Sequence, residues 1–193
     1  MDGTHMELVR RSIERYVPLN EAEWKRIAAC WNALRSFPRN GMVSTAGKTE
    51  PYFYIVVSGV QRLYFEHDGT EHCLGFSYDH SWSGDLESFI TQRPARFNVQ
   101  AITESRLIGI AYEDLQMLYR EMQVMERFGR LILEELIRGR ATREIELLTY
   151  TAAERYDKLL QRSPHLLQLV PQKDIASYLR MTPETFSRLR SRS

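Results

Sequence analysis

The sequence has few of the residues that build metal and redox centres. Its 193 residues include only two cysteines, Cys30 and Cys73, which lie far apart and share no motif with ligand spacing. An iron–sulfur cluster usually takes about four cysteine ligands, so we expect none here. Two isolated cysteines are typical of free core thiols in a reducing compartment, which predicts a cytoplasmic protein.

Long apolar runs are also missing. No stretch approaches the roughly 20 apolar residues that a bilayer-spanning helix needs, so we expect no membrane partner. The first six residues lack the apolar core of a signal peptide. Residues 1–5 are typical of a cloning scar, and the natural chain is expected to begin at Met6.

The charge is distributed unevenly along the chain. The formal net charge is only +1, yet the segment 151–193 holds eight Lys/Arg and four Asp/Glu, a charge of +4, against −3 for the rest. A basic end segment on an acidic body indicates a polyanionic partner for that end.

Hydrophobic periodicity predicts helices first and strands second. Residues 6–36 have helical spacing, broken at Pro18, with Asn20 placed to cap a second helix. After Phe37 the period changes, and Asp68-Gly69 is a strong hairpin turn. The predicted strands cover residues 52–57, 60–65, 71–76, 97–102 and 105–110. Many short strands at regular spacing predict an antiparallel sandwich or barrel.

A long helix is predicted to follow the strands. Residues 122–150 contain no proline and carry a broad apolar stripe that includes Met125, Phe128, Ile145 and Leu148. At about 1.5 Å per residue this helix is about 40 Å long. Its stripe needs a cover, and a twin helix from a second subunit is the natural one. The alternative is a helix that packs only on its own barrel.

The C-terminal residues predict a helix-turn-helix. Two short helices flank the turn Arg180-Met181-Thr182-Pro183, with Thr182 as N-cap and Pro183 as first residue of the last helix. The outward residues of this last helix suit base contacts in a major groove, because arginine pairs with guanine and glutamate accepts from cytosine. The predicted base-facing residues are Pro183, Glu184, Ser187, Arg188 and Arg190, and the predicted phosphate contacts are Gln172, Lys173, Thr182 and Thr185.

Three segments together resemble the Crp/Fnr family of transcription regulators. Ile175 to Leu179 and Met181 to Arg190 are similar to its helix-turn-helix, in which a glutamate and an arginine four residues later read bases; they match Glu184 and Arg188. Residues 54–62 resemble its strand-glycine-strand signature, and residues 84–89 its phosphate-binding cassette.

The resemblance implies an α+β fold in three parts. These are an antiparallel double-stranded β-helix (jelly-roll) barrel, flanked by helices, as a sensor over residues 6–118, a dimerisation helix over 119–150, and a helix-turn-helix domain over 151–193. It further implies a homodimer that binds double-stranded DNA, with RNA polymerase as a possible partner. The effector pocket would include Tyr64, Gly84, Asp85, Leu86 and Arg96.

The sequence departs from the family pattern at three places. Cyclic-nucleotide binders pair a cassette glutamate with an arginine; here Asp85 and Ala95 align, and Arg96 comes one residue late. One residue of slip turns a strand side chain to the opposite face, so we expect no cAMP binding. Arg180 replaces the usual turn glycine, which costs about 1 kcal/mol if its φ is positive. The winged hairpin that often follows is missing or trimmed.

Two alternatives remain open. One is a cupin-like barrel that binds a small molecule, or a metal-dependent enzyme, without DNA binding. Cupin metal sites use a His-x-His pair, and no two of His67, His72 and His80 have that spacing, so we expect neither a metal site nor catalytic residues. The other is a constitutive regulator whose pocket is filled by side chains such as Tyr64, Phe76 and Trp82.

Overall fold

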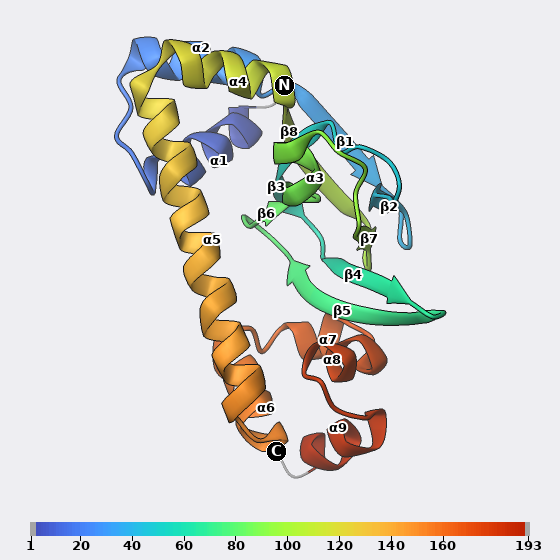
Figure 1. The fold of residues 1–193 in the computed structure, drawn as a ribbon. Coiled ribbons are helices and arrows are strands. Elements are labelled where there is room, and N and C mark those ends of the chain that lie inside the picture. The colour runs from blue at the N-terminus through green and yellow to red at the C-terminus, as the bar shows by residue number, and fades with distance from the viewer. Residues whose placement is uncertain (1–2, 192–193) are drawn as a thin grey trace.

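The computed structural model describes residues 3–191 and contains the predicted antiparallel barrel (Figure 1). Two four-stranded antiparallel sheets have the strand orders β1-β8-β3-β6 and β2-β7-β4-β5. The strands are β1 (Ala33–Phe37), β2 (Met42–Ser44), β3 (Tyr52–Ser58), β4 (Gln61–His67), β5 (Thr70–Ser77), β6 (Trp82–Ser83), β7 (Asn98–Ala101) and β8 (Ser105–Ala111). All five predicted strands are present, and together with the helices they give the α+β fold expected from the sequence.

The β4–β5 hairpin turns where the sequence predicted it. Asp68 and Gly69 have φ values of 49° and 71°, between the paired residues His67 and Thr70. Two positive φ angles in a two-residue loop are typical of a type I′ turn, whose twist matches that of the flanking strands. The hairpin lies on the side of the barrel that faces the C-terminal helices (Figure 1).

The N-terminal helical prediction is correct up to Cys30 and wrong beyond it. Helices α1 (Gly3–Glu14) and α2 (Glu21–Cys30) are present, and Asn20 caps α2 in a capping box with Glu23. Residues 33–36, predicted as helix, belong to β1 instead, and every residue of β1 pairs with β8. Such an edge strand forms because it pairs with a strand that is distant in the sequence, and local periodicity does not reveal that pairing.

Helices α4 (Tyr112–Glu121) and α5 (Gln123–Thr149) follow the barrel. Side chains near the start of α5, such as Phe128 and Ile132, are at most 3% exposed against the barrel. Towards its C-terminal end, Ile145 and Leu148 are 58% and 78% exposed. The predicted stripe therefore has two parts, one covered by the barrel of its own chain and one uncovered.

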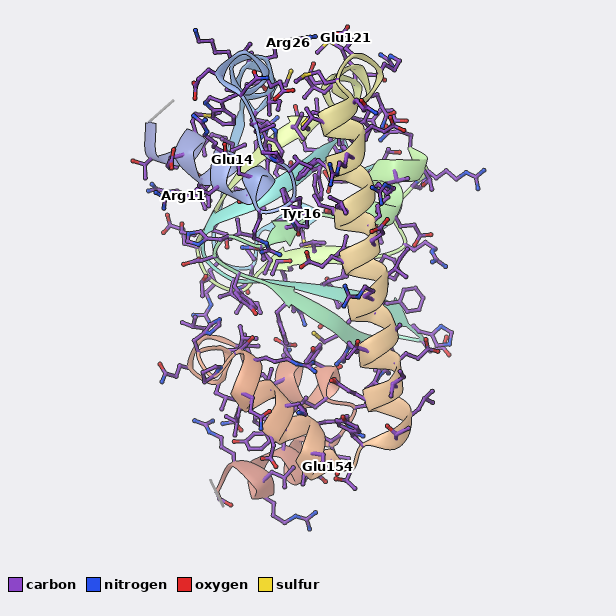
Figure 2. The ribbon with its side chains drawn as sticks, turned by 90° about the vertical axis from the view of Figure 1, so that its left-hand side faces the viewer. Arg11, Glu14, Tyr16, Arg26, Glu121 and Glu154 are labelled. Atoms are coloured by element: carbon purple, nitrogen blue, oxygen red, sulfur yellow. The ribbon has the colours of Figure 1, made fainter. Side chains whose placement is uncertain are left out.

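Contacts at the top of the molecule fix the N-terminal helices onto the α4–α5 pair. The Tyr16 hydroxyl donates to Glu135 Oε2 of α5 over 2.6 Å, and Arg26 of α2 forms an ion pair with Glu121 at the end of α4 (Figure 2). These contacts set the direction in which α5 leaves the barrel.

The last four helices form a small unit that we call the head. They are α6 (Ala152–Arg162), α7 (Leu166–Leu169), α8 (Gln172–Tyr178) and α9 (Pro183–Arg190). Thr151 caps α6, and its backbone amide donates to Glu154, which lies at the lower end of the molecule in Figure 2. Val60 and Ile102 of the barrel share one apolar core with the head, so the two pack directly on each other.

Across residues 3–191, none of the helices combines the length and the apolar character that spanning a membrane requires. Both cysteines are free and buried, as predicted. Burial raises the pKa of Cys73 to about 12, which keeps this thiol protonated and unreactive.

Candidate DNA-binding surface and barrel pocket

The helix-turn-helix has the local geometry that the sequence predicted. Thr182 is the N-cap of α9, its hydroxyl accepting from the Thr185 amide over 3.2 Å, and Pro183 occupies the first helical position. Phe186 of α9 and Ile175 of α8 are fully buried, so they hold the two helices together. The outer side of α9 is thereby left free of the core.

Arg180 occupies the left-handed position of the turn, with φ of 55°. Its amide donates to Ser177 O and the Met181 amide donates to Ala176 O, each over 3.1 Å. This pair of bonds is a Schellman motif, which usually places glycine at the left-handed residue. The predicted backbone strain at Arg180 is therefore present.

The predicted DNA contacts are all at least partly exposed. Eight of the nine are exposed and Thr185 is half-buried; the eight are Gln172, Lys173, Thr182, Pro183, Glu184, Ser187, Arg188 and Arg190. Among residues 3–191, no carboxylate lies within ion-pair distance of Arg188 or Arg190. Their guanidinium groups are therefore available to an external anion or base edge.

Glu184 is held in its charged form. The nearby Glu184 backbone amide and Thr182 hydroxyl stabilise the negative charge of the carboxylate and lower the pKa of Glu184. A carboxylate at the start of a helix is also favoured by the helix dipole. Glu184 therefore presents an acceptor at the exposed N-terminus of α9, as contact with a cytosine amino group requires.

A buried ion pair joins the head to the barrel. Arg62 Nη1 of β4 lies 2.7 Å from Asp174 Oδ1 of α8 and 2.7 Å from Glu71 Oε2 of β5. The Arg62 guanidinium also donates to Gln100 Oε1 and lies over the Tyr64 ring, 4.3 Å from its centroid. No local sequence motif predicts this contact; an arginine in a strand of apolar and aromatic residues is its only local signal.

The cassette segment forms a buried polar cluster rich in acid. Asp85 caps α3 (Leu86–Thr91), its Oδ1 accepting from the Ser88 amide over 3.1 Å, and Asp85 Oδ2 is buried without a hydrogen-bond partner in the described part of the chain. Glu50, 2% exposed, contacts the hydroxyl of Ser44, which accepts from the Asp85 amide. Burial raises the pKa of Glu50 because the charged carboxylate loses its hydration.

The residues predicted to line the effector pocket do not share one site. Gly84 and Asp85 lie by Glu50, Tyr64 lies beneath Arg62, and Leu86 faces an apolar cavity of about 120 Å³ between α3, α4 and α5. Including Arg96 was wrong. Its side chain is 67% exposed and pairs with Glu87 over 2.8 Å, in the bend that precedes β7 (Asn98–Ala101).

The cassette therefore does not fit a cyclic phosphate. Ala95, which stands at the position of the family's arginine, is 5% exposed, and the nearby buried groups are the carboxyls of Glu50 and Asp85. A phosphate placed there would meet these two acidic groups, and Arg96, a cation near Asp85, is exposed and already paired with Glu87.

The idea of a single pocket filled by Tyr64, Phe76 and Trp82 is also wrong. Trp82 stacks on Phe53, with ring centroids 4.8 Å apart, in the core beneath α5. Phe76 packs on Tyr178 of the head, with centroids 5.2 Å apart. These aromatic residues stabilise two different cores.

The barrel histidines belong to no group of metal ligands in the part of the chain that is described. His67 is 67% exposed at the β4–β5 hairpin, beside Asp68. Within residues 3–191, no three His, Cys, Asp or Glu side chains gather in a way that could hold a metal ion.

The barrel matches a known domain family. Residues 34–122 match the model of the cyclic nucleotide-binding domain. No curated protein sequence is significantly similar to the chain.

Solved structures with the fold of the whole chain include Crp/Fnr regulators. FixK2 from Bradyrhizobium japonicum is 22% identical with a TM-score of 0.70, over 83% of each chain. The catabolite activator protein of Thermus thermophilus is 21% identical with a TM-score of 0.56, over 90% of this chain and 83% of its own. CLP from Xanthomonas campestris, a global regulator, is 19% identical with a TM-score of 0.63, over 90% and 91%. The cyclic nucleotide-binding domain, α5 and the head thus have the arrangement of Crp/Fnr regulators.

Proposed function

We propose that this protein is a homodimeric transcription regulator that binds double-stranded DNA through α9, and that it is not an enzyme. The observation that carries the proposal is the outer side of α9, where Glu184 and Arg188 are exposed and Arg188 has no carboxylate partner among the described residues. Shared fold with Crp/Fnr regulators supports the same conclusion. In this arrangement α9 enters the major groove and its polar face reads base edges.

The uncovered part of α5 supports the homodimer. Leu133, Ile137, Ile145 and Leu148 are 39%, 66%, 58% and 78% exposed. Their spacing along the helix places them on one side, as in a coiled-coil seam. A second copy that presents the same stripe would cover them and place two heads on successive major grooves, with half-sites about 34 Å apart.

We propose that cAMP is not the effector of the barrel. The buried carboxyls of Glu50 and Asp85 would repel a cyclic phosphate, and Arg96 lies on the surface. An effector that binds one pose of the head more tightly than another would favour that pose. The resulting change in DNA affinity is limited by the difference between the effector's affinities for the two poses. The Arg62–Asp174 contact links the barrel to the head and is the element through which such a shift would pass.

Fluorescence anisotropy with a labelled duplex tests the proposal. The protein should bind the duplex, and affinity should fall steeply with salt because binding releases counterions from the phosphates. Arg188→Ala should weaken binding, whereas Arg106→Ala, which removes an exposed arginine on β8, should not. Absence of binding at low salt, or equal affinity of wild type and Arg188→Ala, would contradict the assignment of α9.

A further inference from the structure

A small cavity lies where the head, α5 and the barrel meet. Its volume is about 150 Å³, and side chains from β5, α5, α6 and α8 line it together with Ser163. Each water in the liquid occupies about 30 Å³, so the space suits a molecule of a few heavy atoms and excludes a duplex. The cavity is distinct from the cassette of the barrel and from the outer side of α9.

The lining of this cavity is strongly basic. It includes Arg143, Arg155, Lys158 and Arg162 against one carboxylate, Glu146, which leaves a formal charge of +3. Glu146 is 6% exposed and is already engaged by Arg162, whose Nη1 lies 3.1 Å from Glu146 Oε2. Among residues 3–191, no carboxylate lies within ion-pair distance of the other three cations.

Arg143 and Lys158 have the most unused donors among these cations. Arg155 donates to the carbonyls of Tyr150, Leu179 and Arg180. By contrast, Arg143 has one hydrogen bond within the described chain, to Tyr178 O, and Lys158 has one long bond of 3.4 Å to Gln161.

The Arg143 guanidinium is partly buried against an aromatic ring. It lies 3.6 Å from the centroid of the Tyr178 ring, and desolvation lowers the pKa of Arg143. A guanidinium carries five donors in a rigid fork that matches phosphate geometry. Leaving most of these donors without an acceptor in a partly dry site is unfavourable, and the oxygens of water or of a bound anion would satisfy them.

Two hydroxyls complete the lining. Tyr78 OH and Ser163 Oγ lie 2.7 Å apart, and Ser163 is 4% exposed. One hydroxyl donates to the other, so the second O–H is left to donate elsewhere. The cavity thus combines a guanidinium, an ammonium and a hydroxyl donor around a space the size of a small anion.

We propose that this cavity binds a small phosphate-bearing anion, of the size of inorganic phosphate or pyrophosphate. Arg143 and Lys158 hold its oxygens, and the free hydroxyl of the Tyr78–Ser163 pair donates to it. Charge-assisted bonds of this kind are the strong ones in proteins, and a multiply charged oxyanion offsets the local positive charge better than a singly charged carboxylate does. A bound anion would contact the barrel, α5 and the head at once.

Isothermal titration calorimetry of the full-length protein with pyrophosphate, at constant ionic strength in chloride, tests the proposal. We expect saturable binding of one pyrophosphate per chain, weakened at least tenfold in Lys158→Gln and in Arg143→Gln. Arg138→Gln is the matched control, because Arg138 lies exposed on the same helix and does not line the cavity. Thermal unfolding without anion checks that each variant is folded. If Arg143→Gln unfolds, Lys158→Gln decides the test, because among the described residues the Lys158 side chain bonds only to Gln161.

Two outcomes would overturn the proposal. One is the absence of saturable binding to the wild-type protein. The other is equal pyrophosphate affinity in wild type and folded Lys158→Gln; if this variant then binds duplex DNA more weakly, its ammonium serves the DNA backbone instead. Because the titration contains no DNA, its result is independent of the function proposed for α9.

Discussion

The Arg62 guanidinium in the barrel lies 2.7 Å from the Asp174 carboxylate in the head, and both side chains are 8% exposed. The Ser177 hydroxyl on the same helix accepts from the Cys73 amide of β5 over 2.9 Å. Because both bonds come from α8, the first helix of the helix-turn-helix is fixed directly to the β4–β5 hairpin. The pose of α9 therefore depends on the barrel.

Asp174→Asn should loosen this contact. The variant removes a charged partner from a buried arginine, and hydrogen bonds to charged groups contribute about 1.5–3 kcal/mol, so the free energy of unfolding should fall by that amount. Glu71→Gln is the matched control on the same Arg62 atom, but Glu71 is 39% exposed. Glu71→Gln should lower the free energy of unfolding by less than about 1 kcal/mol. Denaturant unfolding measures the free energy of unfolding of both variants. An equal decrease in Asp174→Asn and Glu71→Gln would contradict a larger contribution from the contact between the head and the barrel.

Arg180→Gly should stabilise the protein. At φ of 55° the side chain of Arg180 is strained, and relief of a left-handed residue contributes about 1 kcal/mol. For a chain of this size the melting temperature should rise by about 2–4 °C. Arg180→Ala removes the same side chain but keeps the Cβ atom, so it should give no gain. A gain in both variants would assign the effect to the side chain and not to the backbone.

Glu50 should make stability depend on pH. Burial raises the pKa of Glu50 in the folded protein, so the folded state holds this proton to a higher pH than the unfolded chain does. The contribution of Glu50 to the free energy of unfolding should therefore fall as pH rises from the unfolded pKa to the folded pKa, and level off above it. Glu50→Gln should remove this slope, whereas Glu66→Gln, an exposed control on β4, should retain it. Identical pH profiles for wild type and Glu50→Gln would contradict the prediction.

Leu148→Glu should dissociate the proposed dimer. Burying a leucine side chain contributes about 1.5–3 kcal/mol, and each dimer would bury two copies of Leu148. The dissociation constant should thus rise by about tenfold or more. Leu34→Glu is a control, because Leu34 is 43% exposed on β1, away from α5. Sedimentation velocity measures the association; a monomeric wild-type protein at high concentration would contradict the dimer.

The features that the sequence predicted well are local ones. Asn20, Asp68-Gly69 and Thr182-Pro183 act within a few residues of their own position, so their residue types alone predict the cap, the turn and the helix start. The positive φ of Arg180 follows from its place in the helix-turn-helix pattern. These elements, with the period of the strands, predicted helices around an antiparallel sandwich or barrel, and the resemblance to the Crp/Fnr family implied the three-part fold.

The features that the sequence missed join distant segments. The residues of β1 have no strand signature of their own and are strands because β8 pairs with them. Arg62 and Asp174 are 112 positions apart, and Arg143 reaches Tyr178 over 35 positions. Local pattern contains no information on such contacts, so neither the head–barrel contact nor the basic cavity could be predicted from it.

Selection of duplexes from a random-sequence pool tests the central claim most directly. The proposed regulator should enrich a two-fold symmetric motif whose half-site centres lie about 10 base pairs, or about 34 Å, apart. Repeating the selection with Arg188→Ala should relax the preference at one base pair of each half-site, by about 1–3 kcal/mol. No enriched motif with the wild-type protein, or the same motif with equal preference in Arg188→Ala, would contradict sequence reading by α9.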